Sequence, residues 1–381
     1  MFNKINKDIE KISQNKIFNI FKETYSTLVI WLIAYSLAIM INNIFDLKLL
    51  KNLELLFLRN IPIIINILSG YFYAKYSNKD FVNNIIFSGV LGYIVVESSS
   101  DNVSYFGFLS VVINLVGLVV ISKMDIKINS SFNNILINYL RQLLFPILAC
   151  MYIGSIRYFF VYQVYMKEII SMILGLVSSL PIICILVILI CFFWLFGIHG
   201  VSILGVLLRP LWIQMILINM NCFLTDSPIR YIGTEQFYQW FVWIGGVGST
   251  LGLVIDCYLI GKSSKIKKLK KSMMIAGIYN INEQVLYGLP IIGNKYLQIP
   301  FFLSPMIQTI VAYICFKSNL IEIPYLLAPW PLPWIIGGGI VSGFTINLII
   351  IVLGMLVLSC IIYLPFVMMY DVKLLKSDIS C

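Results

Sequence analysis

The sequence predicts an all-α, polytopic membrane protein, and three observations support this fold class. The chain of 381 residues is 60% hydrophobic and only 12% charged, whereas soluble domains are about 45–50% apolar and about 25% charged. Uninterrupted apolar runs such as Ile182–Leu195 and Leu348–Met368 lack the alternation that is typical of barrel strands. Because backbone groups inside a bilayer must be paired within the segment, we expect these runs to be helices.

Most of the apolar segments have the length of a membrane-spanning helix. Two others, Gly200–Met220 and Trp330–Gly343, are apolar but contain prolines or clustered glycines. Such interrupted segments typically line a cavity in the core of a transporter. The expected spans are Tyr25–Phe45, Leu55–Tyr73, Phe81–Val96, Tyr105–Ile121, Leu136–Tyr158, Ile169–Phe193, Gln239–Gly261, Pro300–Phe316 and Thr345–Met369.

Lysine clusters predict the orientation of the chain. The lysine-rich N-terminal stretch, the run KSSKIKKLKK (Lys262–Lys271) and the tail with Lys373 and Lys376 all belong in the cytoplasm by the positive-inside rule. Two cytoplasmic termini require an even number of crossings, so we expect about ten. The net charge of +10 is thereby explained by membrane orientation, and nucleic-acid binding is not expected. The lysine run itself is expected to be a solvated loop.

Composition and motifs argue against several other functions. The polar stretches, of about 20–30 residues at most, are too short for a nucleotide-binding or phosphocarrier domain, and the chain contains no GxxxxGK[ST] loop. The eight cysteines lie mostly within apolar runs and show no metal-ligand spacing. We therefore predict no metal and no cofactor, and energy must come from a partner protein or an ion gradient.

Ionisable residues within apolar segments are candidate site residues because they are costly in a membrane. His199 is the only histidine of the chain and lies between glycines in WLFGIHG. Glu283 follows Asn280 and Asn282 in YNINEQVLYGLP. A sugar hydroxyl both donates and accepts hydrogen bonds, so carboxylates, amides and an imidazole are its natural partners. These two segments indicate a site that binds hydroxyl groups.

Other polar residues leave structural and functional interpretations open. Asp256 lies near the lysine run, where an ion pair or a helix-end role competes with a site role. Arg141 and Arg157 flank a predicted span and can snorkel to the interface. For Arg209, which precedes a proline, both interpretations remain.

Aromatic and small polar residues extend the candidate site. Trp194, Trp330 and Trp334 lie beside the interrupted segments, where they either stack on a sugar ring or belong to the interfacial belt. The glycine-rich segment Trp243–Asp256 lacks the strand that a dinucleotide-binding loop requires. It is expected to allow close helix packing or local unwinding, which would direct Ser249 and Thr250 toward a substrate.

In this order and spacing, the motifs resemble those of the membrane subunit, enzyme IIC, of the phosphoenolpyruvate-dependent sugar phosphotransferase system (PTS), in its lactose/cellobiose/diacetylchitobiose branch. The resemblance extends over nearly the whole chain and is weakest in the first half. It is carried by NILSGYFYAKY (Asn66–Tyr76), WLFGIHG, GTEQFYQWFVWIGGVGSTLGL (Gly233–Leu253), GIYNINEQVLYGLPIIGN, IPFFLSP (Ile299–Pro305) and APWPLPWIIGGG (Ala328–Gly339).

The resemblance implies a fold and a cellular location. It implies the elevator fold of the glucose superfamily, with about ten spans plus re-entrant hairpins. Residues 1–165 would form an N-terminal dimerisation scaffold, and residues 166–381 a C-terminal transport domain. The protein would be a homodimer in the bacterial plasma membrane.

The resemblance also implies an activity and site residues. The chain would be a permease for a β-disaccharide such as cellobiose, diacetylchitobiose or lactose. A separate enzyme IIB, supplied through enzyme IIA and the phosphocarrier proteins, would phosphorylate the 6-hydroxyl of the sugar. Glu283 would deprotonate that hydroxyl and His199 would hold the same sugar, while Asn282, Thr250 and Trp330 would contact it.

The chain departs from the family pattern at several positions. Gln284, Tyr287 and Lys295 stand where proline, phenylalanine and proline are usual, and Pro331 stands where threonine is common. Lys295 would add a cation near the predicted site. Two alternatives to the permease therefore remain. One is a divergent membrane sensor or receptor that does not phosphorylate sugar, and the other is an ion-coupled secondary transporter that uses Asp256 or Glu283.

Overall fold

In the computed structural model, the regular secondary structure of the described residues is all helical, which confirms the predicted all-α fold class. The predicted span Leu136–Tyr158, with Arg141 and Arg157, lies outside the described residues. Contacts divide the chain into two compact units, Met1–Tyr35 with Ile41–Ile173, and Ser36–Met40 with Leu174–Cys381. The described residues are 15–45, 48–78, 81–97, 107–123, 163–289, 291 and 293–379.

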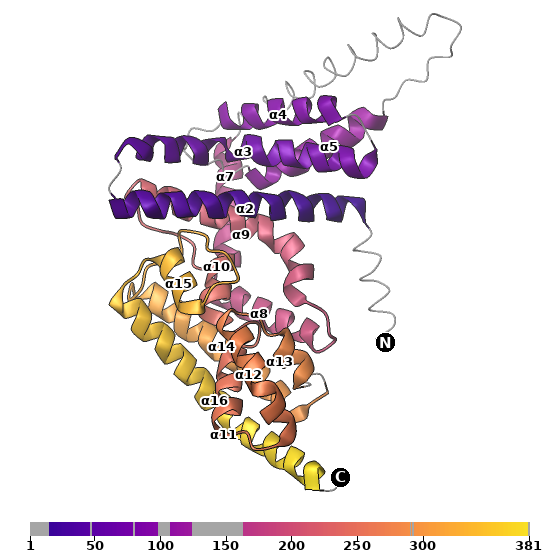
Figure 1. The fold of residues 1–381 in the computed structure, drawn as a ribbon. Coiled ribbons are helices and arrows are strands. Elements are labelled where there is room, and N and C mark those ends of the chain that lie inside the picture. The colour runs from indigo at the N-terminus through magenta and orange to yellow at the C-terminus, as the bar shows by residue number, and fades with distance from the viewer. Residues whose placement is uncertain are drawn as a thin grey trace, which may run out of the picture. The chain divides into compact units, whose positions relative to one another are not determined.

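Four helices carry most of the described part of the first unit. They are α2 (Lys16–Phe45), α3 (Lys48–Ser77), α4 (Phe81–Glu97) and α5 (Gly107–Lys123). Helix α3 packs against both α4 and α5 (Figure 1). All four overlap spans that the apolar runs predict.

A buried polar network joins α3, α4 and α5. The Asn114 side-chain amide donates to the Ser69 hydroxyl at 2.7 Å and to the Asn66 carbonyl at 3.2 Å. The Ser88 hydroxyl lies 3.1 Å from the Asn114 amide oxygen. A Cβ atom at Gly70 would overlap the Ser88 side chain. The Asn-x-x-Ser-Gly residues of the first-half motif therefore serve helix packing.

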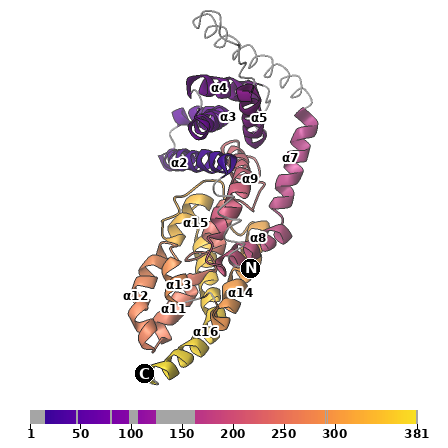
Figure 2. The ribbon, with the colours of Figure 1, turned by 90° about the vertical axis from the view of Figure 1, so that its right-hand side faces the viewer.

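The second unit contains shorter and more irregular helices around one long helix. Helix α16 (Ile346–Ile379), yellow in Figures 1 and 2, packs against α11 (Thr250–Ile260) and α14 (Lys295–Lys317), while α12 (Ser264–Ile278) packs on α11. Helix α7 (Gln163–Val177) runs from the first unit into the second. The others are α8 (Leu180–Trp194), α9 (Gly200–Leu224), α10 (Glu235–Phe237), the π-helix η1 (Tyr238–Val242), α13 (Glu283–Gly288) and α15 (Trp334–Ser342).

Among the described residues, five helices are long and apolar enough to cross a membrane. A sixth results if the bent pair Lys167–Val177 and Leu180–Trp194 is counted as one span. The chain is thus an integral membrane protein, as its composition predicts, and the total of about ten spans stays a prediction. The five are Lys16–Asn42, Leu55–Ser77, Gly200–Leu224, Lys295–Lys317 and Ile346–Asp378.

One segment predicted to be a continuous helix is bent in the structure, and one predicted to be interrupted is continuous. The expected span Ile169–Phe193 is bent by 60° between α7 and α8. A proline lies in the first turn of α8. Proline has no backbone N–H and therefore favours the start of a helix, where the N–H groups have no intrahelical partner, so a new helix begins at this position. Conversely, Gly200–Met220, expected to be interrupted, lies within the continuous helix α9 although Pro210 is inside it. Membrane helices keep a proline when neighbouring groups satisfy the freed carbonyl.

The expected span Gln239–Gly261 is also wrong, because a tight turn separates η1 from α11. Within this turn Gly245, Gly246 and Gly248 have φ angles of +81°, +99° and +91°. These left-handed conformations are accessible to glycine at little cost and are unfavourable for other residues. We call residues 243–249 the glycine turn, and it shows the local unwinding that the glycine pattern indicates.

Candidate functional site

His199 occupies the N-cap of α9, directly after the turn that ends α8. Gly197, with φ of +70°, allows the chain to reverse there, and a Cβ atom at Gly200 would collide with the backbone of Ile190. The His199 ring is exposed, and its centroid lies 4.8 Å from that of Trp194. The glycines of the WLFGIHG motif therefore place the histidine where two helices approach each other closely.

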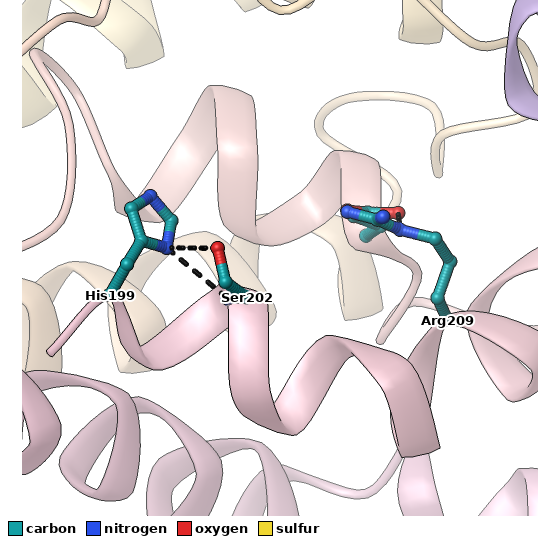
Figure 3. A network of polar contacts seen from close by, with 4 residues as sticks. His199, Ser202 and Arg209 are labelled. Carbon is teal, nitrogen blue, oxygen red and sulfur yellow. Dashed lines mark hydrogen bonds and ion pairs between the residues drawn. The ribbon is translucent and has the colours of Figure 1, made fainter. Parts of the chain in front are cut away.

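The hydrogen bonds of His199 define which ring nitrogen faces a ligand. Nδ1 accepts a hydrogen bond from the backbone N–H of Ser202 at 3.2 Å, and the Ser202 hydroxyl lies 3.0 Å from the same nitrogen (Figure 3). An imidazole nitrogen that accepts a hydrogen bond carries no proton, so the neutral ring has its proton on Nε2. His199 thus presents Nε2–H as a donor.

Glu283 begins α13 and its side chain is exposed. The His199 ring lies within electrostatic range of both the Glu283 carboxylate and the Arg209 guanidinium. No hydrogen bond joins His199 to Glu283 in the described chain. Both side chains are exposed, so Nε2 of His199 and the carboxylate of Glu283 are available to a ligand.

The two asparagines before Glu283 bind protein backbone. The Asn280 amide oxygen accepts a hydrogen bond from Gly245 N–H at 2.8 Å, and the Asn282 amide donates to the Val247 carbonyl at 2.7 Å. Asn282 is only 4% exposed, and a Cβ atom at Gly246 would lie 2.5 Å from its Cγ. These amides position Glu283 against the glycine turn, and a contact between Asn282 and sugar stays a prediction.

Thr250 is likewise engaged within the protein. It is 1% exposed and its hydroxyl donates to the Gly245 carbonyl at 2.7 Å. The carbonyl of Ser249 accepts from the Ser359 hydroxyl at 2.8 Å, and that of Gly248 accepts from the Tyr363 hydroxyl at 2.7 Å. Hydroxyl groups from α11 and α16 thereby hold the glycine turn in shape. A contact between Thr250 and sugar, which the family resemblance implies, stays a prediction.

The tryptophans differ in exposure. Trp330 is 59% exposed and precedes α15, so its ring is available to a ligand or to lipid. Trp334 is 6% exposed and Trp194 4%. Both are therefore largely packed within the protein, and Trp330 is the best placed of the three to stack on a sugar.

An ion pair that the sequence analysis missed lies in the same unit. The Arg209 guanidinium approaches Glu235 with Nη2–Oε1 at 2.9 Å and with Nε 3.3 Å from each carboxylate oxygen. The two side chains are 28% and 17% exposed. Glu235 begins α10 within the GTEQF motif. The sequence signal that could have indicated this pair was the opposite charge of Arg209, in an apolar segment, and of Glu235, in the GTEQF motif.

The lysine run is a helix in the structure, so the expected solvated loop is wrong. Helix α12 contains most of the run. The Asp371 carboxylate of α16 accepts hydrogen bonds from the backbone N–H groups of Lys262 and Ser263, just before α12, and Asp378 accepts one from Ser264, its first residue. Asp256 is 4% exposed, forms no ion pair with this run, and its Oδ2 has no hydrogen-bond partner. The ion-pair interpretation of Asp256 is therefore also wrong.

Lys295 contacts an aromatic ring near the C-terminal helix. Its Nζ lies 5.7 Å from the centroid of the Tyr296 ring, and the Nζ of Lys373 lies 5.6 Å from the same centroid. Lys295 thus belongs to a basic cluster with α16. Among the described residues, no three His, Cys, Asp or Glu side chains gather closely enough to hold a metal ion.

Comparisons with known proteins give the family. The model of the family "Phosphotransferase system, EIIC" matches residues 18–305. The lichenan permease IIC component of Bacillus subtilis is 32% identical over 186 residues, which are 49% of this chain and 41% of that protein. The cellobiose-specific EIIC component of Lactococcus lactis is 27% identical over 251 residues, or 58% and 51% of the two chains.

A solved structure has the same fold. The transporter ChbC, the IIC component from the N,N'-diacetylchitobiose-specific phosphotransferase system, matches with a TM-score of 0.82 at 23% identity, over 98% of each chain. The chain is thus an integral membrane protein that shares the fold of this solved structure. The chain belongs to the EIIC family of the phosphotransferase system, as its motifs predict. It matches about half the length of these curated relatives.

Proposed function

We propose that this chain is the sugar permease of a phosphotransferase system and translocates a β-disaccharide that is phosphorylated at its 6-hydroxyl. The observation that carries the proposal is that the match to the EIIC family covers residues 18–305, which include both His199 and Glu283, two exposed polar side chains. The substrates in the names of its relatives, which include cellobiose, lichenan, lactose and galactose, support a glycoside as substrate.

The residues of the site have complementary roles in this proposal. His199 donates Nε2–H to a sugar oxygen and fixes the pose of the ring. Glu283 accepts the proton of the 6-hydroxyl, since general-base catalysis requires a carboxylate within hydrogen-bond reach of that proton. The phosphoryl donor is a phosphocysteine on a separate enzyme IIB, which is itself supplied through enzyme IIA and the phosphocarrier proteins. Trp330 provides a face on which the sugar ring stacks.

The proposal assigns a role to each half of the chain. Residues 1–165 form the dimer scaffold of a homodimer in the bacterial plasma membrane, and residues 166–381 move the sugar. Both termini and the lysine run face the cytoplasm, which the positive-inside rule supports. A cysteine in place of the exposed Lys268, in a variant whose eight native cysteines are replaced by serine, tests the orientation. An impermeant maleimide should label it in inside-out vesicles and leave it unlabelled in intact cells.

Uptake of labelled cellobiose, diacetylchitobiose and lactose into vesicles tests the activity. We expect sugar 6-phosphate only when phosphoenolpyruvate and the soluble phosphotransferase proteins are present. Free sugar that accumulates with an ion gradient would favour the secondary transporter instead, and no uptake of any glycan would favour the sensor or receptor.

Two carboxylate substitutions test the assignment of Glu283. Glu283→Gln should abolish phosphorylation while the protein stays folded and binds sugar. Glu322→Gln is the matched control because Glu322 is also exposed but lies in another part of the sequence, so it should keep the wild-type rate. Normal turnover in Glu283→Gln would contradict the role of Glu283 as general base.

A further inference from the structure

The ion pair between Arg209 and Glu235 leaves one edge of the guanidinium unused. Nε and Nη2 face the carboxylate, whereas Nη1 donates no hydrogen bond to any residue that the structure describes. A guanidinium has five N–H donors in a planar arrangement. Two of the five therefore belong to the free Nη1 group of a side chain that is 28% exposed.

The direction of the Arg209 side chain relates it to the candidate site. In Figure 3 the Arg209 side chain extends back along α9, toward the end of the helix that carries His199 and Ser202. The charge of Arg209 also reaches the His199 ring, as that of Glu283 does. The charges of Arg209 and Glu283 therefore both act on the surroundings of the His199 ring. In the described part of the chain, the Glu235 carboxylate accepts hydrogen bonds from Arg209 alone, so it fixes the guanidinium in place.

We propose that Arg209 is the phosphoryl-binding residue of this site, held in position by Glu235. This inference rests on the proposed function. When the oxygen of the sugar 6-hydroxyl attacks the phosphorus of the phosphocysteine, an O–P bond forms and the S–P bond breaks. The electron pair of the broken bond leaves with the cysteine sulfur, and the hydroxyl proton goes to Glu283. The Nη1 donors of Arg209 bind the non-bridging oxygens of the transferred group.

The chemistry of the guanidinium favours this ligand. Arginine binds phosphate oxygens through two parallel N–H donors, because the planar guanidinium matches the geometry of a phosphate group. An uncharged hydroxyl gains much less from a nearby cation. Arg209 should therefore distinguish the phosphorylated sugar from the free sugar, whereas His199 and Trp330 should bind both. A residue that only ties α9 to α10 would make no such distinction.

Binding measurements on the purified full chain test this inference. Calorimetry first identifies which of cellobiose, lactose and diacetylchitobiose binds the wild-type protein, and then compares that sugar with its 6-phosphate. Arg209→Gln would leave Glu235 unpaired, so the main variant is the double substitution Arg209→Gln with Glu235→Gln, which replaces the ion pair by two neutral amides. Arg230→Gln is the control, because it removes an exposed arginine of the same unit.

We expect the double variant to bind the free sugar within about threefold of wild type and the 6-phosphate about 10- to 100-fold more weakly, as expected for a lost charge-assisted hydrogen bond. Arg230→Gln should change neither affinity. Equal weakening of both ligands, or an unchanged affinity for the 6-phosphate, would overturn the role of Arg209. A wild-type chain that binds none of the sugars would instead overturn the proposed function, and this inference with it.

Discussion

The side-chain amide of Asn282 donates a hydrogen bond to the carbonyl of Val247 across 2.7 Å. This bond joins the residue before Glu283 to the glycine turn, which is 35 positions earlier in the chain. Asn280 forms a second bond to the same turn through Gly245. The position of Glu283 is therefore determined by the shape of a turn that is itself fastened by Ser359 and Tyr363 of α16.

The first prediction concerns this bond. Asn282→Ala removes the donor and leaves a buried carbonyl without its partner, which costs roughly 1–3 kcal/mol. We expect a decrease of that size in the free energy of unfolding, measured by reversible denaturation in mixed micelles. Gln284→Ala is the control, since this exposed amide two residues away should change stability by about 0.5 kcal/mol or less. Equal effects of both substitutions would show that the bond does not stabilise the fold.

The second prediction concerns the glycine turn. Gly248 has a φ angle of +91°, and a Cβ atom there would overlap the ring of Phe301. Gly248→Ala should therefore strain the backbone and displace the ring, and the variant should lose sugar uptake and unfold at lower temperature. Gly354→Ala provides the comparison, because a Cβ at this position of α16 meets no atom within 4 Å. It should be neutral or stabilising by up to about 1 kcal/mol, since alanine is the better helix former. A fully active Gly248→Ala variant would mean that the turn tolerates a side chain.

The third prediction separates the two functions of His199. Asparagine is a preferred N-cap residue, so His199→Asn should still accept the Ser202 N–H and keep the start of α9 intact. It removes Nε2–H, the donor assigned to the sugar. We expect near-wild-type thermal stability but at least about tenfold weaker sugar binding by calorimetry, the loss of roughly one hydrogen bond. His199→Ala should lose both properties. Wild-type affinity in His199→Asn would show that the ring does not contact the sugar.

The sequence predicted much of this fold because lipid imposes a simple rule on composition. Long apolar runs such as that in α16 have to be helices, and their approximate positions followed directly. The breaks were harder to place, since one proline or glycine has different effects in different surroundings. Pro181 lies in the first turn of α8, whereas Pro210 lies in the middle of α9. Whether a proline starts a helix or lies inside one depends on the segments that pack against it, and the local sequence does not show which segments these are.

Prediction of the site was limited for a similar reason. His199 and Glu283 stand out because they are ionisable residues within largely apolar segments, and both side chains are exposed in the structure. A polar residue in a membrane segment can equally serve the protein backbone, as the contacts of Asn282 and Thr250 show. The contact between Arg209 and Glu235 joins residues 26 positions apart, and no periodicity or motif reports such a pair.

The last prediction concerns the start of the lysine-rich helix α12. The Asp371 carboxylate accepts hydrogen bonds from Lys262 N–H at 2.9 Å and from Ser263 N–H at 3.0 Å. Such carboxylates satisfy the unpaired donors of a helix start and interact favourably with its dipole. Removal of the cap should increase local opening of a helix that contains several lysines, and each lysine that becomes accessible is a site for trypsin.

We therefore expect Asp371→Ala to increase the rate of tryptic cleavage within residues 265–271 several-fold in inside-out vesicles, measured by mass spectrometry of the fragments. Asp378→Ala should have a smaller effect, because Asp378 is exposed to water and binds only Ser264. Lys376→Gln, on the same stretch of α16, is the matched control and should leave cleavage of α12 unchanged. The order of the three variants is decisive, since water can replace the cap at an exposed position but not at the buried Asp371. If Asp371→Ala were cleaved no faster than Lys376→Gln, α12 would be held by its packing on α11 rather than by its cap.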